Sequence, residues 1–144
     1  MPRPITMKDR IRAAGLRATP GRLALAEWLE QAHAPVGTPA LAERFVPSEF
    51  DLATLYRTLK SFEERKLVRS VVIDARYASY EWVEDASEHH HHLVCTKCGL
   101  IVEIPPCDLS SLEKKVLAGT SGFASVTSHS LEFFGICRAC LKKR

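Results

Sequence analysis

The sequence predicts an α+β protein made of two domains. Three observations favour this fold class: helix-start signals recur through the first 60 residues, two β-rich segments follow them, and two close cysteine pairs lie beyond residue 94. We expect a first domain over residues 1–83, a polar hinge over residues 84–88 and a second domain over residues 89–144. The second domain is short for a self-sufficient core, so a bound metal or a second copy of the chain is expected to stabilise it.

The composition is that of an ordinary soluble protein, with 46% hydrophobic and 26% charged residues among 144. No apolar stretch approaches the roughly 20 residues that a membrane-spanning helix needs, so we expect a cytoplasmic protein with no membrane partner. The net charge of +3 is mild, yet residues 1–22 hold six basic residues and a single acid. This N-terminal part is therefore the candidate surface for a polyanion such as DNA.

Four helices are expected in the first domain because each begins with an N-cap pattern. Thr6 and Asp9 have the spacing of a capping box, and the Thr-Pro pairs at 19–20 and 38–39 place proline in the first turn. Asp51 is the expected N-cap of the fourth helix. The expected helices cover residues 7–14, residues from Pro20, residues from Pro39 to Phe45, and residues 52–65.

The fourth of these helices has two distinct faces. One face is apolar and is expected to pack on the core; it consists of Leu52, Leu55, Leu59 and Phe62. The other face includes groups that donate hydrogen bonds or stack; it consists of Ala53, Tyr56, Arg57 and Lys60. An exposed face of this kind suits a recognition helix in the major groove of DNA.

Two β-rich segments, residues 67–74 and 76–82, follow the fourth helix with a short turn between them. They predict a β-hairpin. Helices followed by a hairpin are typical of a winged helix-turn-helix domain, in which the hairpin is the wing. The same pattern also fits a helical domain whose amphipathic helix simply has one solvated face, and both interpretations stay open at this point.

In the second domain, the segment GLIVEI at residues 99–104 predicts a strand, and the two prolines after it end that strand. Asp108 is the expected cap of a helix that carries Leu109, Leu112 and Val116. A last β-rich segment is expected over residues 123–135. Together these elements predict a small strand-helix-strand module.

Two Cys-x-x-Cys pairs supply the four thiolates of a closed tetrahedral zinc site. The pairs are Cys95 with Cys98 and Cys137 with Cys140. Because 38 residues separate the pairs, the zinc ion would link the two ends of the whole strand-helix-strand module. Two unrelated surface pairs, or a redox-active dithiol at one of them, are the alternatives. Cys107 belongs to neither pair and is expected to be a free thiol.

Four consecutive histidines, residues 89–92, precede the first cysteine pair. In a strand, alternate side chains share a face, so His90 and His92 would share one face and the other two histidines the opposite face. Each pair needs further ligands, for which the candidates are Glu81, Glu103, Asp108, Glu113, His33 and His129. A carboxylate beside imidazoles makes a harder, more exchangeable site than four thiolates, of the kind that senses iron, manganese or zinc.

Five segments together resemble the ferric uptake regulator (Fur) family of bacterial metal-sensing repressors. They are GLRATPGR, ATLYRTL, YEW, HHHHLVCTKCGLIVE and HSLEFFGICRAC, in that order along the chain. The resemblance implies an N-terminal winged helix-turn-helix DNA-binding domain, a hinge and a small C-terminal α/β dimerisation domain. It further implies a homodimer that binds palindromic, A/T-rich operators when loaded with metal and represses metal-uptake genes, with iron as the expected signal.

The resemblance also implies residue roles by position. The structural zinc ligands would be Cys95, Cys98, Cys137 and Cys140. The regulatory site, for iron, manganese or zinc, would use His33, Glu81, His90 and His92. An additional metal site would use His89, His91 and His129, with Glu113 in place of the family's glutamate, because Ser110 occupies that position; Glu103 is a further carboxylate candidate. DNA contacts would come from Arg17, Tyr56, Arg57 and, on the same helix face, Lys60.

Three alternatives stay open. A zinc-uptake or peroxide-responsive regulator would share the fold. In the resemblance, zinc sensors often have cysteine in place of Glu81, and peroxide sensors tend to have aspartate where this chain has Glu81 or Glu103. A zinc hydrolase would need a motif such as HExxH and a separate general base; neither is evident, so we expect no enzyme and no small-molecule substrate. A DNA-binding protein whose metals are all structural would unfold when chelated.

Overall fold

The computed structural model describes residues 4–84, 90–104 and 108–143. The chain separates into two compact units, Met1–Ala86 and Ser87–Arg144, and each is described by itself. Four sequence predictions fall outside the described residues: most of the hinge at 84–88, the strand-ending Pro105-Pro106 pair, the free thiol of Cys107, and the metal ligand His89.

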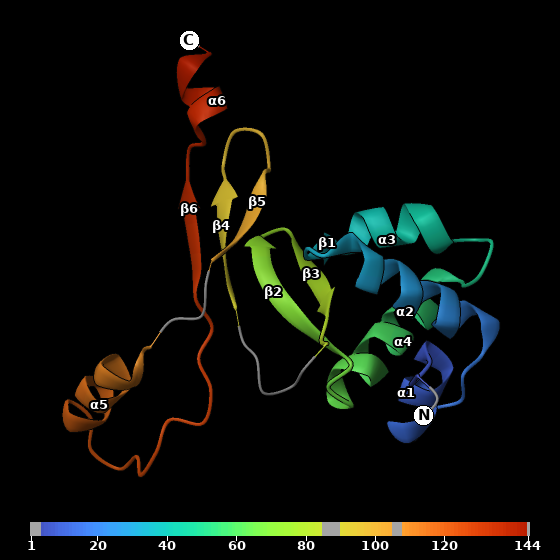
Figure 1. Cartoon of the computed structure of the whole chain (residues 1–144), viewed down its shortest axis with the longest axis horizontal. Helices are drawn as coiled ribbons and strands as arrows, with labels where there is room; N and C mark the ends of the chain where they lie inside the picture. The colour runs from blue at the N-terminus through green and yellow to red at the C-terminus, as the bar shows by residue number, and fades with distance from the viewer. Residues whose placement is uncertain (1–3, 85–89, 105–107, 144) are drawn as a thin grey trace. The chain divides into compact units, whose positions relative to one another are not determined.

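The N-terminal unit begins with the four expected helices (Figure 1). They are α1 (Met7–Ala13), α2 (Pro20–Ala32), α3 (Thr38–Phe45) and α4 (Leu52–Glu64). The capping box of α1 is confirmed, since the Asp9 backbone N–H donates to the Thr6 hydroxyl and the Thr6 N–H donates to the Asp9 carboxylate at 3.1 Å. Thr19 caps α2, and Asp51 caps α4 by accepting from the Thr54 N–H at 2.7 Å. These local patterns set the helix starts.

The N-cap of α3 differs from the prediction by one residue. Gly37 occupies the N-cap, without a side-chain hydrogen bond, and Thr38 is the first helical residue. The Thr38 side chain is buried, with 3% of its surface exposed. Thr38 is therefore a buried residue of the first helical turn and does not cap the helix.

A three-stranded antiparallel sheet completes this unit in the order β1-β3-β2 (Figure 1). Its strands are β1 (Val36–Gly37), β2 (Val68–Asp74) and β3 (Tyr77–Trp82). The predicted hairpin is β2–β3, with Arg69 directly opposite Glu81 and Val68 opposite Trp82. The hairpin follows α4 immediately, as a wing follows its recognition helix.

The core of the N-terminal unit lies between the helices and the sheet. Its fully buried members include Ile11, Leu25, Leu41, Leu55, Leu59 and Phe62. The apolar stripe of α4 is thus confirmed at Leu55, Leu59 and Phe62, but Leu52 is 50% exposed. Leu52 is the first residue of α4, where the helix has not yet reached the core. Among the described residues, no helix is long and apolar enough to cross a membrane.

The C-terminal unit is built on a mixed three-stranded sheet in the order β5-β4-β6 (Figure 1). Its strands are β4 (His91–Cys95), β5 (Ile101–Ile104) and β6 (Glu132–Gly135). The central strand β4 pairs antiparallel with β5 and parallel with β6. Helix α5 (Ser110–Ala118) lies in the connection between β5 and β6, and α6 (Arg138–Lys142) follows β6.

Two predictions for the C-terminal unit need correction. The β-rich segment 123–135 is a strand only at 132–135, because residues 123–131 form no ladder with a neighbouring strand. Asp108 is not the N-cap of α5, which is Leu109. The Asp108 carboxylate instead accepts from the Ser110 N–H at 2.9 Å, the local turn that aspartate commonly makes two residues before its partner.

Few side chains of the C-terminal unit are buried. Among its described residues these are His91, His92, Val94 and Cys95, while α5 and α6 have no buried residue. A core this small does not stabilise a domain by hydrophobic burial alone. The C-terminal unit therefore needs further stabilisation, for which a bound metal or a second copy of the chain is expected from its short length.

Candidate metal centres and DNA-binding surface

The four cysteines of the two Cys-x-x-Cys pairs come together in the C-terminal unit. Their sulfur atoms all lie within 4.8 Å of one another, and the Sγ atoms of Cys98 and Cys137 are 3.7 Å apart. Zinc–sulfur bonds of about 2.3 Å in a tetrahedron would separate the sulfurs by about 3.8 Å. The residues present therefore fit a structural zinc ion.

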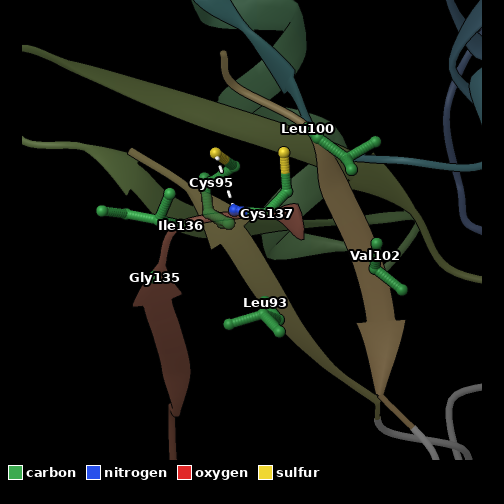
Figure 2. A pocket seen from close by; sticks show the side chains of 8 residues that line it. Leu93, Cys95, Leu100, Val102, Gly135, Ile136 and Cys137 are labelled. Atoms are coloured by element: carbon green, nitrogen blue, oxygen red, sulfur yellow. Dashed lines mark hydrogen bonds between the residues drawn. The ribbon is translucent and has the colours of Figure 1, made fainter. Parts of the chain in front are cut away.

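Local backbone structure explains how the cysteines converge. Cys95 ends the central strand, and the chain then turns through Gly99, whose φ of 73° suits glycine. Cys137 is the N-cap of α6 and accepts from the Cys140 N–H at 3.4 Å. The Cys137 N–H in turn donates to Cys95 Sγ at 3.3 Å, the dashed line in Figure 2. Each pair is therefore held in a chelating turn.

The same contacts shift the acidities of the thiols in opposite directions. The Cys137 N–H, followed by the Cys98 N–H, lowers the pKa of Cys95 to about 6. Hydrogen bonds from the Cys140 thiol to the sulfurs of Cys98 and Cys137 raise the pKa of Cys140 to about 12. Crowded thiols do not all ionise without a cation between them, which is the charge that a zinc ion supplies.

Beside this cluster, one face of the sheet is an apolar hollow. Figure 2 shows Leu93, Val102 and Ile136 around it, next to Cys95 and Cys137. Leu93, Val102 and Ile136 are 44%, 49% and 50% exposed. Leu93 in β4 stands opposite Val102 in β5 and Phe133 in β6, so the exposed apolar surface runs across all three strands.

The histidines at residues 90–92, where β4 begins, alternate as expected of a strand. The rings of His90 and His92 are neighbours, with centroids 5.2 Å apart, whereas His91 instead lies against His129, also at 5.2 Å. His91 and His92 are both buried, with 4% and 3% exposure. The two faces of one strand thus present imidazoles to two separate places.

Acidic side chains flank the His90 and His92 face. The register places Glu103 of β5 and Glu132 of β6 on either side of His92. His90 Nδ1 is 3.7 Å from a Glu103 oxygen, and His92 Nδ1 is 3.9 Å from a Glu132 oxygen. The Glu103 side chain is 60% exposed, but that of Glu132 is only 12% exposed. Glu132 is not among the ligand candidates identified from the sequence. The only indication there is an acidic residue within the apolar segment LEFFG.

On the opposite face, two imidazole nitrogens point at each other. A carbonyl oxygen only accepts, so the contact of His91 Nδ1 with Leu131 O at 2.9 Å places the proton on Nδ1 and the lone pair on Nε2. His129 Nδ1 likewise lies 3.1 Å from a Glu113 oxygen. The two Nε2 atoms are 3.3 Å apart, and two zinc-bound nitrogens would be about 3.4 Å apart.

Glu113 occupies a supporting position in this arrangement. Its carboxylate contacts the outer nitrogen of His129 and not the point where the two Nε2 atoms meet. A carboxylate at the outer nitrogen of a ligand histidine fixes the tautomer and raises its basicity. Ser110, which the resemblance assigns to the position of the family's glutamate, begins α5 and is exposed.

The remaining candidate ligands lie in different surroundings. Glu81, in β3 of the N-terminal unit, is buried at 5% exposure and is paired with Arg69 across the hairpin. His33 is exposed at the C-cap of α2 in a left-handed conformation with φ of 48°. Asp108 is exposed and bonded to its own turn.

The predicted DNA-contacting residues lie on the surface of the N-terminal unit. Tyr56 is 47% exposed, and Arg57 and Lys60 are exposed on the same face of α4. The Arg57 guanidinium donates to the Thr54 hydroxyl at 2.9 Å, which holds it near the start of the helix. Arg17 is exposed just before α2. Cationic and aromatic side chains on one exposed helix face suit a nucleic-acid contact.

A winged-helix domain linked to thiolate and imidazole clusters defines a class, the metal-dependent transcriptional regulators. The sequence profile of the ferric uptake regulator family matches residues 13–134, and the chain belongs to this family. It is therefore a metal-responsive DNA-binding regulator and not an enzyme. Members of the family bind DNA operators as dimers.

Three relatives illustrate the range of the family. The peroxide-responsive repressor PerR of Staphylococcus aureus (strain Mu50 / ATCC 700699) is 27% identical over 135 residues, 92% of this chain and 88% of that protein. The Vibrio cholerae ferric uptake regulator structure is 27% identical with a TM-score of 0.70, covering 92% of this chain and 100% of that chain. A zinc-bound manganese uptake regulator is 26% identical with a TM-score of 0.63, covering 92% and 98%.

Proposed function

We propose that this regulator represses metal-uptake genes by binding palindromic, A/T-rich operators as a metal-loaded homodimer, with iron as its signal. The observation that carries the proposal is the separation of two kinds of ligand set in one chain. Four thiolates gather in one cluster, whereas imidazoles and carboxylates gather in others. Thiolates retain zinc, and the harder sets exchange ions such as iron and manganese. An operator on the chromosome would place this activity in the cytoplasm.

The regulatory site of the proposal consists of Glu81, His90 and His92, with His33 as a further candidate. Glu81 belongs to the wing hairpin, whereas His92 belongs to β4 of the other domain and His90 directly precedes that strand. Ligands shared between the domains would favour the arrangement that unites them, and so shift the population toward a fixed spacing of the two DNA-binding domains. A carboxylate at position 81, where a thiolate would favour zinc, supports iron or manganese.

A second exchangeable site is proposed at the facing Nε2 atoms of His91 and His129. Their outer nitrogens are held by Leu131 O and by Glu113, so both lone pairs are preoriented toward one point. Two nitrogens leave a tetrahedral ion short of ligands, and His89 would supply a third. Such a site beside β6 would stabilise the fold of the C-terminal domain.

The second copy of the chain is proposed to cover the apolar sheet face around Leu93. Dimeric assembly of the family and the small core of this domain both support this occupant. We expect Leu93→Glu to raise the dissociation constant of the dimer by roughly tenfold or more, because a charge would be buried in an apolar interface. Sedimentation equilibrium would measure this, with Lys97→Glu, at an exposed position, as the control. An unchanged dimer dissociation constant for Leu93→Glu would contradict the assignment of this face as the dimer interface.

The exposed face of α4 is proposed to enter the major groove. We expect Arg57→Ala to weaken operator binding and to reduce the slope of log affinity against log salt concentration by about 1, because one phosphate contact is lost. Fluorescence anisotropy at several salt concentrations would measure the slope. Lys115→Ala removes the same charge from α5 and should leave the slope unchanged; an equal effect of both variants would contradict a specific role for Arg57.

The function itself is tested by operator selection. Zinc-loaded protein, mixed with random duplex DNA, should enrich a palindromic A/T-rich sequence when Mn²⁺ or Fe²⁺ is present, and no such sequence with a chelator that leaves the thiolate-bound zinc in place. Enrichment of the same sequence in both arms would point to a DNA-binding protein whose metals are all structural. Enrichment with Zn²⁺ alone would make the protein a zinc-uptake regulator.

A peroxide-responsive regulator is the second candidate function. Two observations favour it: the 27% identity to PerR of Staphylococcus aureus, and the carboxylate of Glu103 at 3.7 Å from His90. Iron(II) reacts with peroxide and manganese(II) does not, so brief exposure to dilute hydrogen peroxide should abolish operator binding by the iron-loaded protein alone. Equal tolerance of both forms would exclude this candidate.

A further inference from the structure

The wing hairpin contains an ion pair between Arg69 and the proposed metal ligand Glu81. The two residues are directly opposite in the β2–β3 register, and the Arg69 Nε–H donates to Glu81 Oε1. Their side chains are 29% and 6% exposed, so this carboxylate is largely withdrawn from water. A nearby positive charge stabilises the ionised form of a buried carboxylate.

We propose that Arg69 is a positioning residue that acts as an internal counter-ion: it competes with the regulatory metal for Glu81 and thereby sets the metal concentration at which the protein responds. The inference rests on the proposed function, in which Glu81 is a ligand. Arg69 itself is not a ligand, since a guanidinium has no lone pair to offer.

The competition follows from the charges. Without metal, the guanidinium compensates the buried carboxylate, and this pairing stabilises the metal-free protein. With a divalent ion on the same carboxylate, the guanidinium faces a like charge at short range and shares the oxygens with it. Metal binding therefore weakens the interaction between Arg69 and Glu81. Because this interaction must be given up, the net affinity of the site for metal is lower than it would be without Arg69.

The hairpin also provides a matched control. Arg76 pairs with Asp74 at 2.6 Å in the turn of the same hairpin. The side chains of Arg76 and Asp74 are 80% and 24% exposed, so more water reaches Asp74 than reaches Glu81 when the arginine is removed. Arg76→Gln therefore removes the same charge and the same type of ion pair, but it leaves a carboxylate that is more exposed to water than that of Glu81.

The test measures Mn²⁺ affinity by electron paramagnetic resonance of the free ion at pH 7.5, in full-length protein with its thiolate cluster loaded with zinc. We expect Arg69→Gln to bind Mn²⁺ on the order of tenfold more tightly than the wild type, because one charged hydrogen bond no longer competes. Arg69→Lys should remain close to the wild type because it keeps the charge, and Arg76→Gln should not differ from it. Unchanged or weaker Mn²⁺ binding by Arg69→Gln would overturn the inference.

Two further variants separate this inference from the proposed function. Glu81→Gln should lose Mn²⁺ affinity, and adding Arg69→Gln to it should bring no gain. If Glu81→Gln binds Mn²⁺ normally, the proposed ligand set itself fails. If Arg69→Gln does not fold without metal, Mn²⁺ should restore its fold where Mg²⁺ does not, since the ion then replaces the missing charge; failure of that rescue would also overturn the inference.

Discussion

Cys98→Ser is expected to abolish zinc binding and to unfold the C-terminal domain, while the N-terminal domain stays folded. The Cys98 side chain is exposed, so its replacement removes no core packing. What it removes is one of four sulfurs within 4.8 Å of one another. Structural zinc sites contribute about 10–16 kcal/mol to folding in small zinc-binding peptides, far more than the few buried side chains of this domain supply.

Elemental analysis and circular dichroism would measure this outcome. We expect the zinc content to fall from one per chain to near zero, the β-sheet signal of the C-terminal domain to disappear, and the dimer to dissociate. Helices α1 to α4 should persist, because their core lies within the N-terminal unit. Cys107→Ser, outside both pairs, is the control and should retain zinc. A folded, dimeric Cys98→Ser protein would show that the cluster is not structural.

The second large effect is expected from the double variant Glu81→Ala, His90→Ala. It should fold, dimerise and retain one zinc ion per chain, because it leaves the four cysteines intact. It should not gain operator affinity when Mn²⁺ or Fe²⁺ is added, whereas the wild type should gain roughly tenfold to hundredfold, the usual range of coupling between two sites. Loss of coupling with an intact fold is what distinguishes a regulatory ligand from a structural one.

Gel shifts on the selected operator, with and without metal, would measure this coupling. Glu84→Ala is a suitable control because it removes an exposed carboxylate just beyond β3. It should respond to metal as the wild type does. A double variant that still gains operator affinity with metal would eliminate Glu81 and His90 as the regulatory ligands, and the His91 and His129 site would then be the next candidate.

Local chemistry made the N-terminal domain predictable from the sequence. The caps at Thr6, Thr19 and Asp51 act over three residues, so they are visible without knowledge of the fold. The hairpin could also be predicted from the sequence, because its two strands are separated by a short turn. The prediction failed at Leu52 and Thr38, where contact with the core decides burial and cannot be read from helical periodicity.

Register between distant strands was not predictable. The sequence indicates that alternate histidines share a face, and the ring contacts of His90 with His92 agree with this. It does not indicate that Glu132, 40 residues further on, stands beside His92, because β6 pairs parallel to β4 after a long connection. The pairing of Arg69 with Glu81 also depends on the hairpin register, which one extra residue would change.

Metal that acts at a site distinct from the zinc cluster is proposed to control operator binding. The most direct test is a titration of wild-type protein, carrying one zinc per chain, with Mn²⁺ in the presence of its selected operator, while zinc content and dimeric state are followed in the same samples. We expect operator affinity to rise with Mn²⁺ while the zinc content and the dimeric state remain constant. Operator affinity that is independent of Mn²⁺, or that changes only when zinc is lost, would contradict it.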